Sequence, residues 1–211
     1  MSTSFNKSGI VEASGIEVGA NLIEKSKDFS GWSINSIFTI NQISTGEYVA
    51  LASRTGATSN AWSRIIPTVK LNPELCPNGV TASFDFKCDD INALDHKCIC
   101  SLQIYNSSNT RIGWYEAKNS FTEANYIGST MLEDGVWKRL SCYFNQSNLK
   151  TISSSGYTAN DVSYTMLSFQ LVKNGSIGFK NIKLELGPVP TPWIPNSADY
   201  GVVPTQHGFA E

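Results

Sequence analysis

Aromatic, amide and arginine side chains recur at alternate positions in several short segments, and a sugar-binding surface needs this combination. Sugars have apolar ring faces and polar rims, so a surface that binds them requires exposed aromatic rings beside amides and guanidinium groups. Side chains on a strand alternate between its two faces, and this parity selects the candidates. The candidates for carbohydrate contact are Trp62, Arg64, Gln103, Tyr105, Trp114, Tyr115, Arg139 and Tyr143.

The same aromatic residues have a second interpretation. Aromatic side chains on the second face of a β-sandwich often pack beneath loops or against a neighbouring subunit. The sequence leaves both interpretations open. For Trp32, Trp137 and Trp193 we expect places in the core or in the C-terminal segment.

Catalytic motifs are absent from the sequence. No G-x-S-x-G, H-E-x-x-H or phosphate-loop pattern occurs, and His96 is the one plausible base because His207 lies in a proline-bearing tail. A glycosidase needs only two carboxylates. The available ones mostly fall at expected turns or on solvated strand faces, so we expect a non-enzymatic chain: Asp85, Asp89, Asp90, Asp95, Glu116, Glu123, Glu133 and Asp134.

The cysteines favour buried, reduced thiols. There are five of them, an odd number at irregular spacing, whereas a secreted disulfide scaffold has an even and denser set. Cys88 continues an apolar face, and Cys98 and Cys100 share one with Leu102. A zinc site from Cys88, His96, Cys98 and Cys100 is the alternative, and it is disfavoured because no pair has the C-x2-4-C spacing. We therefore expect no metal.

Charge and hydropathy exclude several partners. The chain has 16 Lys and Arg against 18 Asp and Glu, a net charge of −2, and so lacks the basic footprint of a nucleic-acid-binding protein. No window approaches the roughly 18 consecutive apolar residues of a membrane span. The first eight residues lack the apolar region of a signal peptide, so we expect synthesis in the cytoplasm.

Composition and alternation predict an all-β fold. Ser, Asn and Thr number 27, 18 and 15, and these residues favour turns and strand surfaces over helix interiors. One helical turn is expected at 90–95. Alternating or β-branched runs bounded by turn signals predict strands at 36–42, 47–53, 61–66, 80–88, 98–105, 111–117, 135–144, 164–172 and 176–186.

The chain divides into an N-terminal arm at 1–20, a β-sandwich at 21–186 and a proline-rich extended tail at 187–211. Proline at the density of the tail cannot join a central sheet. The arm and the tail carry apolar side chains without periodic partners, so we expect both segments to dock on other chains. The candidate assembly residues are Phe5, Ile10, Val11, Ile16, Trp193, Ile194 and Phe209.

Three segments resemble known families. The run 182–199 (Ile-Lys-Leu-Glu-Leu-Gly-Pro-Val-Pro-Thr-Pro-Trp-Ile-Pro-Asn-Ser-Ala-Asp) is similar to the segment that closes many bacteriophage tail, baseplate and fibre proteins. Asn-Leu-Ile at 21–23, Gly-Trp at 31–32 and the run 134–144 resemble a jelly-roll carbohydrate-binding-module pattern. The run 5–17 is similar to the start of many phage fibre domains.

This resemblance implies a jelly-roll β-sandwich in a phage virion, made in the cytoplasm of a bacterial host. The implied function is that of a non-enzymatic structural protein (head fibre, tail or baseplate decoration) anchored through its termini to other virion proteins. The alternative is a carbohydrate- or receptor-binding module whose main role is adhesion to host-surface glycans. The fibre resemblance also implies a homo-oligomer, and a trimer is our expectation.

Similar jelly-roll modules often hold a structural calcium near the start of the last strand. Here Asn181 stands where the similar pattern often has Asp, with Lys180 and Lys183 beside it. Asn offers one oxygen and no charge, which disfavours a structural calcium at this position without excluding it.

Overall fold

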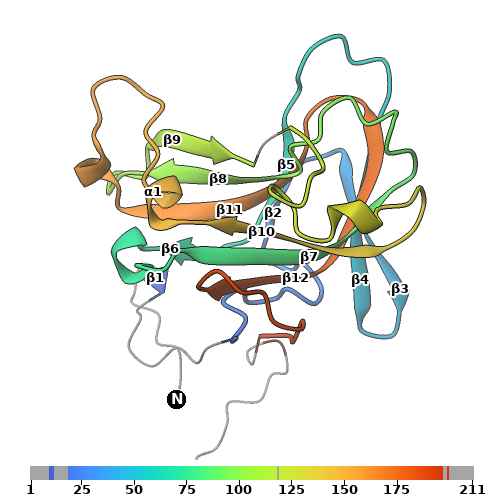
Figure 1. Cartoon of the computed structure of the whole chain (residues 1–211), viewed down its shortest axis with the longest axis horizontal. Helices are drawn as coiled ribbons and strands as arrows, with labels where there is room; N and C mark the ends of the chain where they lie inside the picture. The colour runs from blue at the N-terminus through green and yellow to red at the C-terminus, as the bar shows by residue number, and fades with distance from the viewer. Residues whose placement is uncertain (1–9, 12–18, 118, 197–198, 200–211) are drawn as a thin grey trace, which may run out of the picture.

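The computed structural model describes residues 10–11, 19–117, 119–196 and 199, and it contains two β-sheets packed face to face (Figure 1). The five-stranded sheet has the order β10 (Lys138–Phe144), β7 (Val80–Cys88), β12 (Gly175–Leu186), β4 (Glu47–Arg54) and β3 (Phe38–Ser44). The seven-stranded sheet contains β9 (Arg111–Glu116), β8 (Cys100–Tyr105), β11 (Tyr164–Leu171), β5 (Ser63–Ile66), β6 (Lys70–Leu71), β2 (Ser33–Ile34) and β1 (Ile10–Val11).

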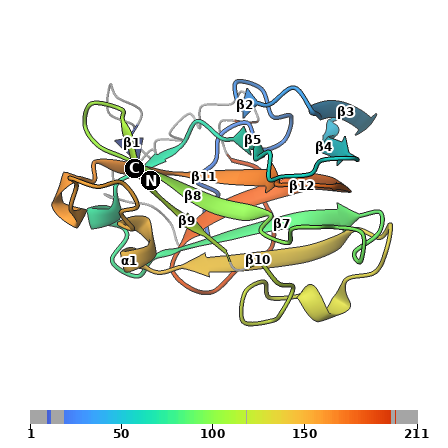
Figure 2. The ribbon, with the colours of Figure 1, turned by 90° about the horizontal axis from the view of Figure 1, so that it is seen from above.

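The predicted all-β sandwich is confirmed, and each of the nine expected strands has a counterpart within a few residues. In the seven-stranded sheet β8 lies between β9 and β11, while β5 and β6 both pair with the far side of β11 (Figure 2). The sequence did not reveal the two-residue strands β1, β2 and β6, because runs this short carry no alternation. In β1, residues 10 and 11 pair in parallel with 70 and 71.

The two sheets enclose a core of aromatic rings. Phe84 of β7 lies 4.9 Å from Phe169 of β11 between ring centroids, in an edge-to-face arrangement. Phe179 of β12 contacts both rings, at 5.8 and 5.2 Å. All three side chains have no exposed surface. Such contacts join the two sheets, and they come from the inward positions that strand alternation predicts.

Helices are short in the described part of the chain: α1 (Gln146–Leu149) and the 3-10 turns η1 (Pro73–Leu75), η2 (Ser129–Met131) and η3 (Ala159–Asp161). The segment 90–95, where one helical turn was expected, forms a turn at 91–93 that belongs to no helix, and Asp90 Oδ1 accepts hydrogen bonds there from the backbone N–H groups of Asn92 and Ala93. Among these described residues no helix is long and apolar enough to cross a membrane.

All five cysteines are free and buried, as predicted. Burial raises the pKa of the Cys98 thiol to about 12. The expectation that Cys98 shares a face with Cys100 is wrong, because strand alternation begins only at Cys100, and the adjacent residues Ile99 and Cys100 both face the core. Gln170 Nε2 donates to Cys98 Sγ at 3.2 Å on the opposite side of the sheet from the core.

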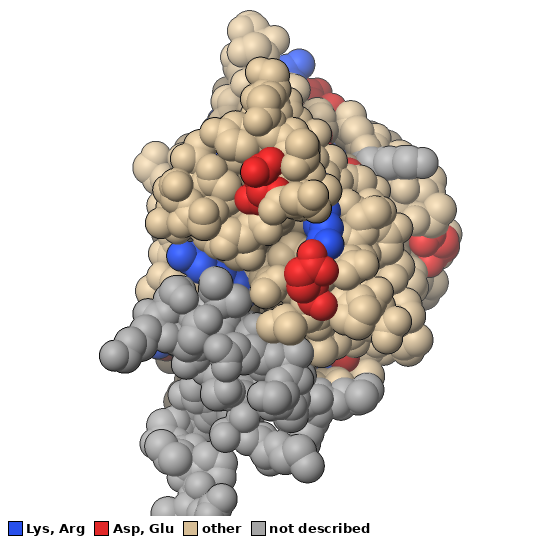
Figure 3. Space-filling model, turned by 90° about the vertical axis from the view of Figure 1, so that its left-hand side faces the viewer, with Lys and Arg blue, Asp and Glu red and all other residues tan. Residues whose placement is uncertain are grey.

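About half of the charged side chains among the described residues occur as close pairs of opposite sign. The described residues form seven ion pairs. These pairs differ in burial: Lys87–Asp89, at 3.2 Å, is partly exposed, whereas Lys183–Glu185, also at 3.2 Å, is fully buried. On the end of the molecule near α1 the described surface is mainly uncharged, with acidic and basic groups in small separate clusters (Figure 3). This pattern gives that end no extended basic patch.

The start of the sandwich is tied to its end by Asn21, which is 4% exposed. Its Nδ2 donates to the backbone oxygens of Ile182 and Ile194, each at 3.2 Å. Its Oδ1 accepts from the backbone N–H groups of Ile23 and Leu184. Asn196 Nδ2 in turn donates to the Asn21 backbone oxygen at 2.6 Å. One side chain therefore joins the first residues of the sandwich, strand β12 and the tail.

The tail from Gly187 to Asn196 lies against the outer face of the five-stranded sheet of its own chain. Lys183 Nζ donates to Thr191 Oγ1 and to the Pro192 oxygen, and the Thr191 N–H donates to Glu185 Oε1 at 2.9 Å. Trp193 Nε1 donates to the Ile182 oxygen at 3.3 Å. We call this arrangement, together with the Asn21 bonds, the clasp.

The structure places some of the assembly residues that we expected from the sequence, and the clasp contains one of them. Trp193, which we expected to bind another chain, is half-buried on its own sheet, whereas Ile194 is 50% exposed. Ile10 and Val11 lie in β1, next to β6. Phe5, Ile16 and Phe209 lie outside the described residues, as do most of the arm and residues 200–211 of the tail.

Replacing Asn21 with Ala is expected to lower the free energy of unfolding by about 2–4 kcal/mol, because it leaves several buried backbone groups without a partner. Chemical denaturation followed by tryptophan fluorescence measures the change. Asn160→Ala is the matched control, since Asn160 is exposed in η3. Equal unfolding midpoints for the two variants would contradict a contribution of the clasp to stability.

Candidate functional site

Four polar side chains form a buried network on the outer face of the seven-stranded sheet. Ser101 and Gln103 come from β8, and Ser168 and Gln170 come from β11; each is at most 2% exposed. The hydroxyls of Ser101 and Ser168 are 2.7 Å apart, and the Ser101 hydroxyl donates to Gln170 Oε1 at 3.1 Å. Gln103 Nε2 donates to Ser101 Oγ at 3.3 Å. We call these four residues the polar floor.

The floor exists because polar residues alternate with core residues on both strands. Leu102 and Ile104 of β8 point into the core, and so do Leu167 and Phe169 of β11. The antiparallel register places Ser168 opposite Ser101 and Met166 opposite Gln103. The polar positions of the two strands therefore meet on one face.

Aromatic and cationic side chains border the floor on both sides. On β5, Arg64 lies over the ring of Trp62 at 5.2 Å, and its Nε donates to Gln170 Oε1 at 3.2 Å. On β9, Arg111 lies over the ring of Trp114 at 5.7 Å, and its Nη1 donates to Gln103 Oε1 at 3.1 Å. Each arginine is thus held between an aromatic ring and a floor amide.

A third aromatic group lies at the other end of the same face. The rings of Tyr105 and Tyr164 stack at 5.0 Å, and Lys70 Nζ lies 4.4 Å from the centre of the Tyr164 ring. The Tyr164 hydroxyl donates to Asn109 Oδ1 at 2.9 Å. We call the floor and its bordering residues the platform; the bordering residues are Trp62, Arg64, Lys70, Tyr105, Arg111, Trp114, Glu116 and Tyr164.

Glu116 is the one carboxylate among the described residues of the platform, opposite Ser101 in the register of β8 and β9. Burial raises the pKa of its carboxyl group, and the positive charge of Arg64 partly opposes this. Burial also lowers the pKa of Arg64, and the nearby charge of Arg111 lowers it further. The charge of Arg64 therefore interacts with those of Arg111 and Glu116.

His96 contacts the platform without the partners of a catalytic base. Its ring meets that of Trp62 edge-to-face at 5.5 Å, and its Nδ1 accepts from the Cys98 N–H at 3.2 Å. Burial lowers its pKa. The imidazole therefore supports the Trp62 side of the platform in its neutral form.

Five of the eight sugar-contact residues expected from the sequence meet on the platform: Trp62, Arg64, Gln103, Tyr105 and Trp114. Tyr115 does not join them. It follows Trp114 on the same strand and therefore points to the opposite face, where its ring meets Phe144 at 6.0 Å.

Arg139 and Tyr143 lie on β10, in the other sheet. Arg139 donates to Asp85 Oδ1 at 3.2 Å and to Ser83 Oγ at 2.7 Å. Tyr143 is 41% exposed, and its hydroxyl donates to the Asn78 oxygen. Parity correctly placed these two residues on one outer face, but parity does not say to which sheet a strand belongs.

Sequence reasoning missed seven members of the platform as sugar contacts: Ser101, Ser168, Gln170, Arg111, Glu116, Lys70 and Tyr164. A signal for five of them was present, since Ser101 has the parity of Gln103, Glu116 has that of Trp114, and Tyr164, Ser168 and Gln170 alternate with Leu167 and Phe169. Arg111 breaks the parity because a bulge separates it from the rest of the β8–β9 ladder.

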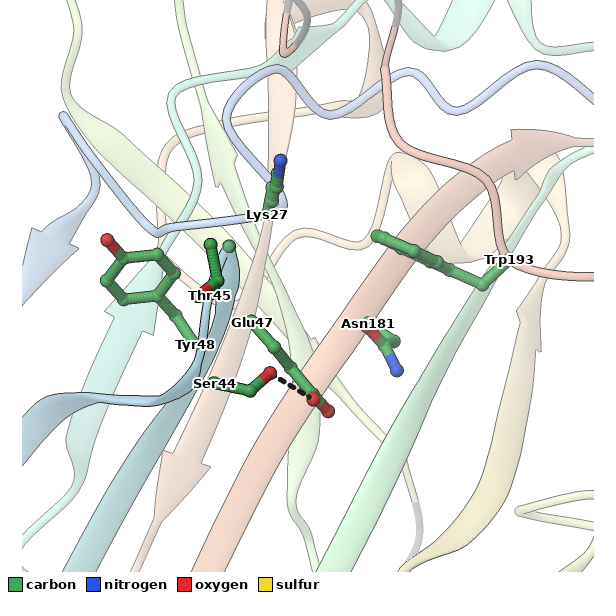
Figure 4. A pocket seen from close by; sticks show the side chains of 8 residues that line it. Lys27, Ser44, Thr45, Glu47, Tyr48, Asn181 and Trp193 are labelled. Carbon is green, nitrogen blue, oxygen red and sulfur yellow. Dashed lines mark hydrogen bonds between the residues drawn. The ribbon is translucent and has the colours of Figure 1, made fainter.

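A pocket of about 350 Å³ lies on the other sheet, where the tail meets the β3–β4 hairpin. Trp193 borders one side, and Lys27, Thr45 and Tyr48 border the other (Figure 4). The Glu47 carboxylate between them is bound by Ser44 Oγ at 3.1 Å and by Lys180 Nζ at 2.6 Å. The carboxylate of this pocket thus already has partners, whereas Lys27 forms no ion pair with the described residues.

At Asn181, the position considered for calcium in the sequence analysis, protein groups already bond to the nearby carboxylate of Asp85. Asn181 donates from Nδ2 to Asp85 Oδ2 at 2.7 Å, and Arg139 pairs with the other oxygen of Asp85. Among the described residues no three His, Cys, Asp or Glu side chains gather closely enough to hold a metal ion, including the set Cys88, His96, Cys98 and Cys100. The donor set at Asp85 does not fit calcium.

Most carboxylates outside the platform hold structural partners. Asp89 accepts from Ser176 Oγ, Glu123 accepts from the Gly128 and Thr130 N–H groups, and Asp134 accepts from the Ile91 N–H. Glu133 pairs with Lys138 at 2.6 Å. These groups fix turns and strand ends.

No protein-family model and no curated protein sequence matches the chain. Among solved structures, it is similar to a xylan-binding CBM22-1 domain from Paenibacillus barcinonensis, with 12% identity over 83% of this chain and 99% of that one, at a TM-score of 0.46. It is also similar to the baseplate tripod of bacteriophage Tuc2009, with 14% identity, coverage of 86% and 60%, and a TM-score of 0.45.

An arabinose-bound α-L-arabinofuranosidase is similar as well, with 10% identity over 80% of this chain and a TM-score of 0.44. The chain spans only 26% of that enzyme and 60% of the baseplate chain. Similarities of this size do not decide what this chain binds.

The Glu116 carboxyl is expected to titrate above the usual range for Glu, and Arg64→Gln is expected to move its pKa higher still by removing the opposing positive charge. NMR titration of the side-chain carboxyl group measures both. The pKa of Glu116 is then higher in the folded state than in the unfolded state. Its contribution to the free energy of unfolding is therefore complete below the unfolded-state pKa and is lost as the pH rises through the folded-state pKa. Lys87→Gln, on the other sheet, is the control; an unmoved Glu116 pKa in Arg64→Gln contradicts the coupling.

Proposed function

We propose that the chain binds carbohydrate on the platform and catalyses no reaction there. The observation that supports this best is the buried polar floor beside the ring of Trp114, which is 41% exposed. A sugar presents an apolar ring face and a rim of hydroxyls. The ring face is suited to the exposed indole, and the hydroxyls are suited to the guanidinium N–H groups of Arg64 and Arg111, which the buried floor holds in place beside it.

The floor favours a ligand with many weak polar contacts over an apolar one. Its side chains are bound to one another and to Arg64 and Arg111, so they are already ordered before a ligand arrives. Ordered side chains lower the entropy lost on binding. An apolar ligand would remove the guanidinium groups above the floor from water without giving them hydrogen-bond partners, which costs free energy.

The arrangement of the carboxylates supports a binding role without hydrolysis. Glycosidases use two Asp or Glu residues that flank the scissile bond. The described part of the platform offers Glu116 alone, and His96 already accepts a backbone hydrogen bond through Nδ1.

Replacing Trp114 with Ala is expected to weaken glycan binding about tenfold or more, since loss of a central aromatic contact commonly costs at least about 1.4 kcal/mol. A glycan array identifies the ligand, and isothermal titration calorimetry measures its affinity for each variant. Tyr143→Ala is the matched control, because Tyr143 is also 41% exposed but lies on the other sheet.

The comparison of these two variants decides the location of binding. Unchanged affinity in Tyr143→Ala with weakened binding in Trp114→Ala supports the platform. The reverse result places the sugar on the five-stranded sheet, and no binding of the unmodified chain to any arrayed glycan refutes the carbohydrate function.

We further propose that the chain is a structural component of a phage virion that docks on other virion proteins through its termini. The sequence resemblance of the arm and the closing segment supports this role. So do Val189 and Ile194, which expose 70% and 50% of their surface on the tail. In this proposal the terminal segments assemble the particle, as a homo-oligomer and most simply a trimer, while the platform contacts host-surface glycans.

Deleting residues 1–18 is expected to convert a trimer of the 23.1 kDa chain into a folded monomer, because it removes the arm and β1 while keeping Asn21 and the clasp. Sedimentation equilibrium gives the mass of the full and shortened chains, and circular dichroism checks that the sheets remain. A full chain that sediments as a monomer contradicts the oligomer; a shortened chain that is still trimeric contradicts docking through the arm.

A further inference from the structure

The cations of the platform lack carboxylate partners. Seven Lys or Arg side chains of the described residues form ion pairs elsewhere on the molecule. Arg64, Lys70 and Arg111 form none with the described residues. Glu116 is near enough to affect the pKa of Arg64 but is not in an ion pair with it. The platform therefore keeps three positive charges whose strongest kind of partner is missing.

Each of these three cations is held by neutral groups. Arg64 is fixed by Trp62 and Gln170, and Arg111 is fixed by Trp114 and Gln103. Lys70 lies over Tyr164 and donates to Asn109 Oδ1 at 3.4 Å. Neutral contacts position a cation without cancelling its charge, so the charge remains for an external anion.

We propose that the platform selects acidic oligosaccharides, that is, sugars bearing carboxylate or phosphate groups, through Arg64 and Arg111 with Lys70 in support. This inference rests on the carbohydrate-binding function proposed above and names the class of its ligand. Guanidinium groups match both anions in geometry because they donate parallel N–H bonds. The arginines form their floor bonds through Arg64 Nε and Arg111 Nη1, and other guanidinium N–H groups remain for an anion.

The strands that carry the three cations are spread across the face, so a ligand that reaches all three must be longer than one sugar. The backbones of Arg64 on β5 and Arg111 on β9 are separated by β11 and β8, which gives three interstrand steps, or about 14 Å, although their side chains are near enough for the charge of Arg111 to lower the pKa of Arg64. Gln170 and Tyr164, which mark the Arg64 and Lys70 ends, are six residues apart on β11, or about 20 Å. An oligosaccharide with acidic groups on more than one residue can reach all three cations.

Local electrostatics favour an anion despite Glu116. Arg64 is partly buried and near Arg111, and both effects disfavour its charged form. A bound anion would offset both, and Glu116 is one negative charge against three positive ones. The selectivity is electrostatic, so it should weaken as salt rises and the Debye length shortens.

The test compares paired glycans that differ only in charge. An oligogalacturonate and its carboxyl-reduced twin probe carboxylates, and a mannose-6-phosphate oligosaccharide and its phosphatase-treated twin probe phosphates. Calorimetry at low salt is expected to give about tenfold tighter binding for at least one acidic member than for its neutral twin. That ratio should fall towards one in the Arg64→Gln/Arg111→Gln variant and in high salt.

Lys87→Gln is the charge-matched control, because Lys87 lies on the other sheet in an ion pair with Asp89. Arg111→Gln alone serves if the double variant fails to fold, since Arg111 is exposed. Neutral twins that bind as tightly as acidic ones overturn the selectivity and leave the carbohydrate function standing. A ratio that survives both arginine variants overturns the assignment to these residues. Failure of all four probes, with no array ligand either, refutes both proposals together.

Discussion

The outer face of the five-stranded sheet depends on one buried ion pair. Lys183 and Glu185 are 0% and 1% exposed, and charges buried this deeply are tolerated only when they are fully bonded. The remaining partners come from the tail, through Thr191 and the Pro192 oxygen. The tail must therefore lie on this sheet, and Asn21 then joins it to the start of the sandwich. A segment whose prolines exclude it from any sheet still becomes part of the fold, because it completes the bonding of two charges.

The two outer faces of the sandwich differ in how far their polar groups are already bonded. On the five-stranded sheet the polar groups are saturated by their own chain: Arg139 is bonded to Asp85 and Ser83, and Lys180 to Glu47. On the seven-stranded sheet the floor amides are bonded, but the arginines above them keep their charge. The tail adds to this contrast, because it bonds to Lys183 and Glu185 on the five-stranded sheet. The contrast also explains why aromatic residues with equal exposure, Trp114 and Tyr143, are expected to behave differently.

Local sequence signals account for the strands, and long-range pairing accounts for what they miss. Alternation located all nine longer strands and placed Trp114, Gln103 and Tyr105 on an outer face, because side-chain parity is a local property. It could not separate Arg139 from these residues, since sheet membership depends on the pairing of β10 with β7, more than fifty residues away. The clasp was also hidden: Lys183 and Glu185 look like solvated strand residues in the sequence, and their burial depends on the docked tail.

The polar floor links stability to binding on the open face. Four hydroxyl and amide side chains, at most 2% exposed, would cost free energy there without their mutual hydrogen bonds. Arg64 and Arg111 extend this network outward, so the bonds that satisfy the floor also fix the guanidinium groups in place. An arginine side chain that is free before binding loses considerable rotamer freedom when it binds a ligand. On this platform part of that loss has already occurred on folding, which leaves more of each contact with a ligand to appear as affinity.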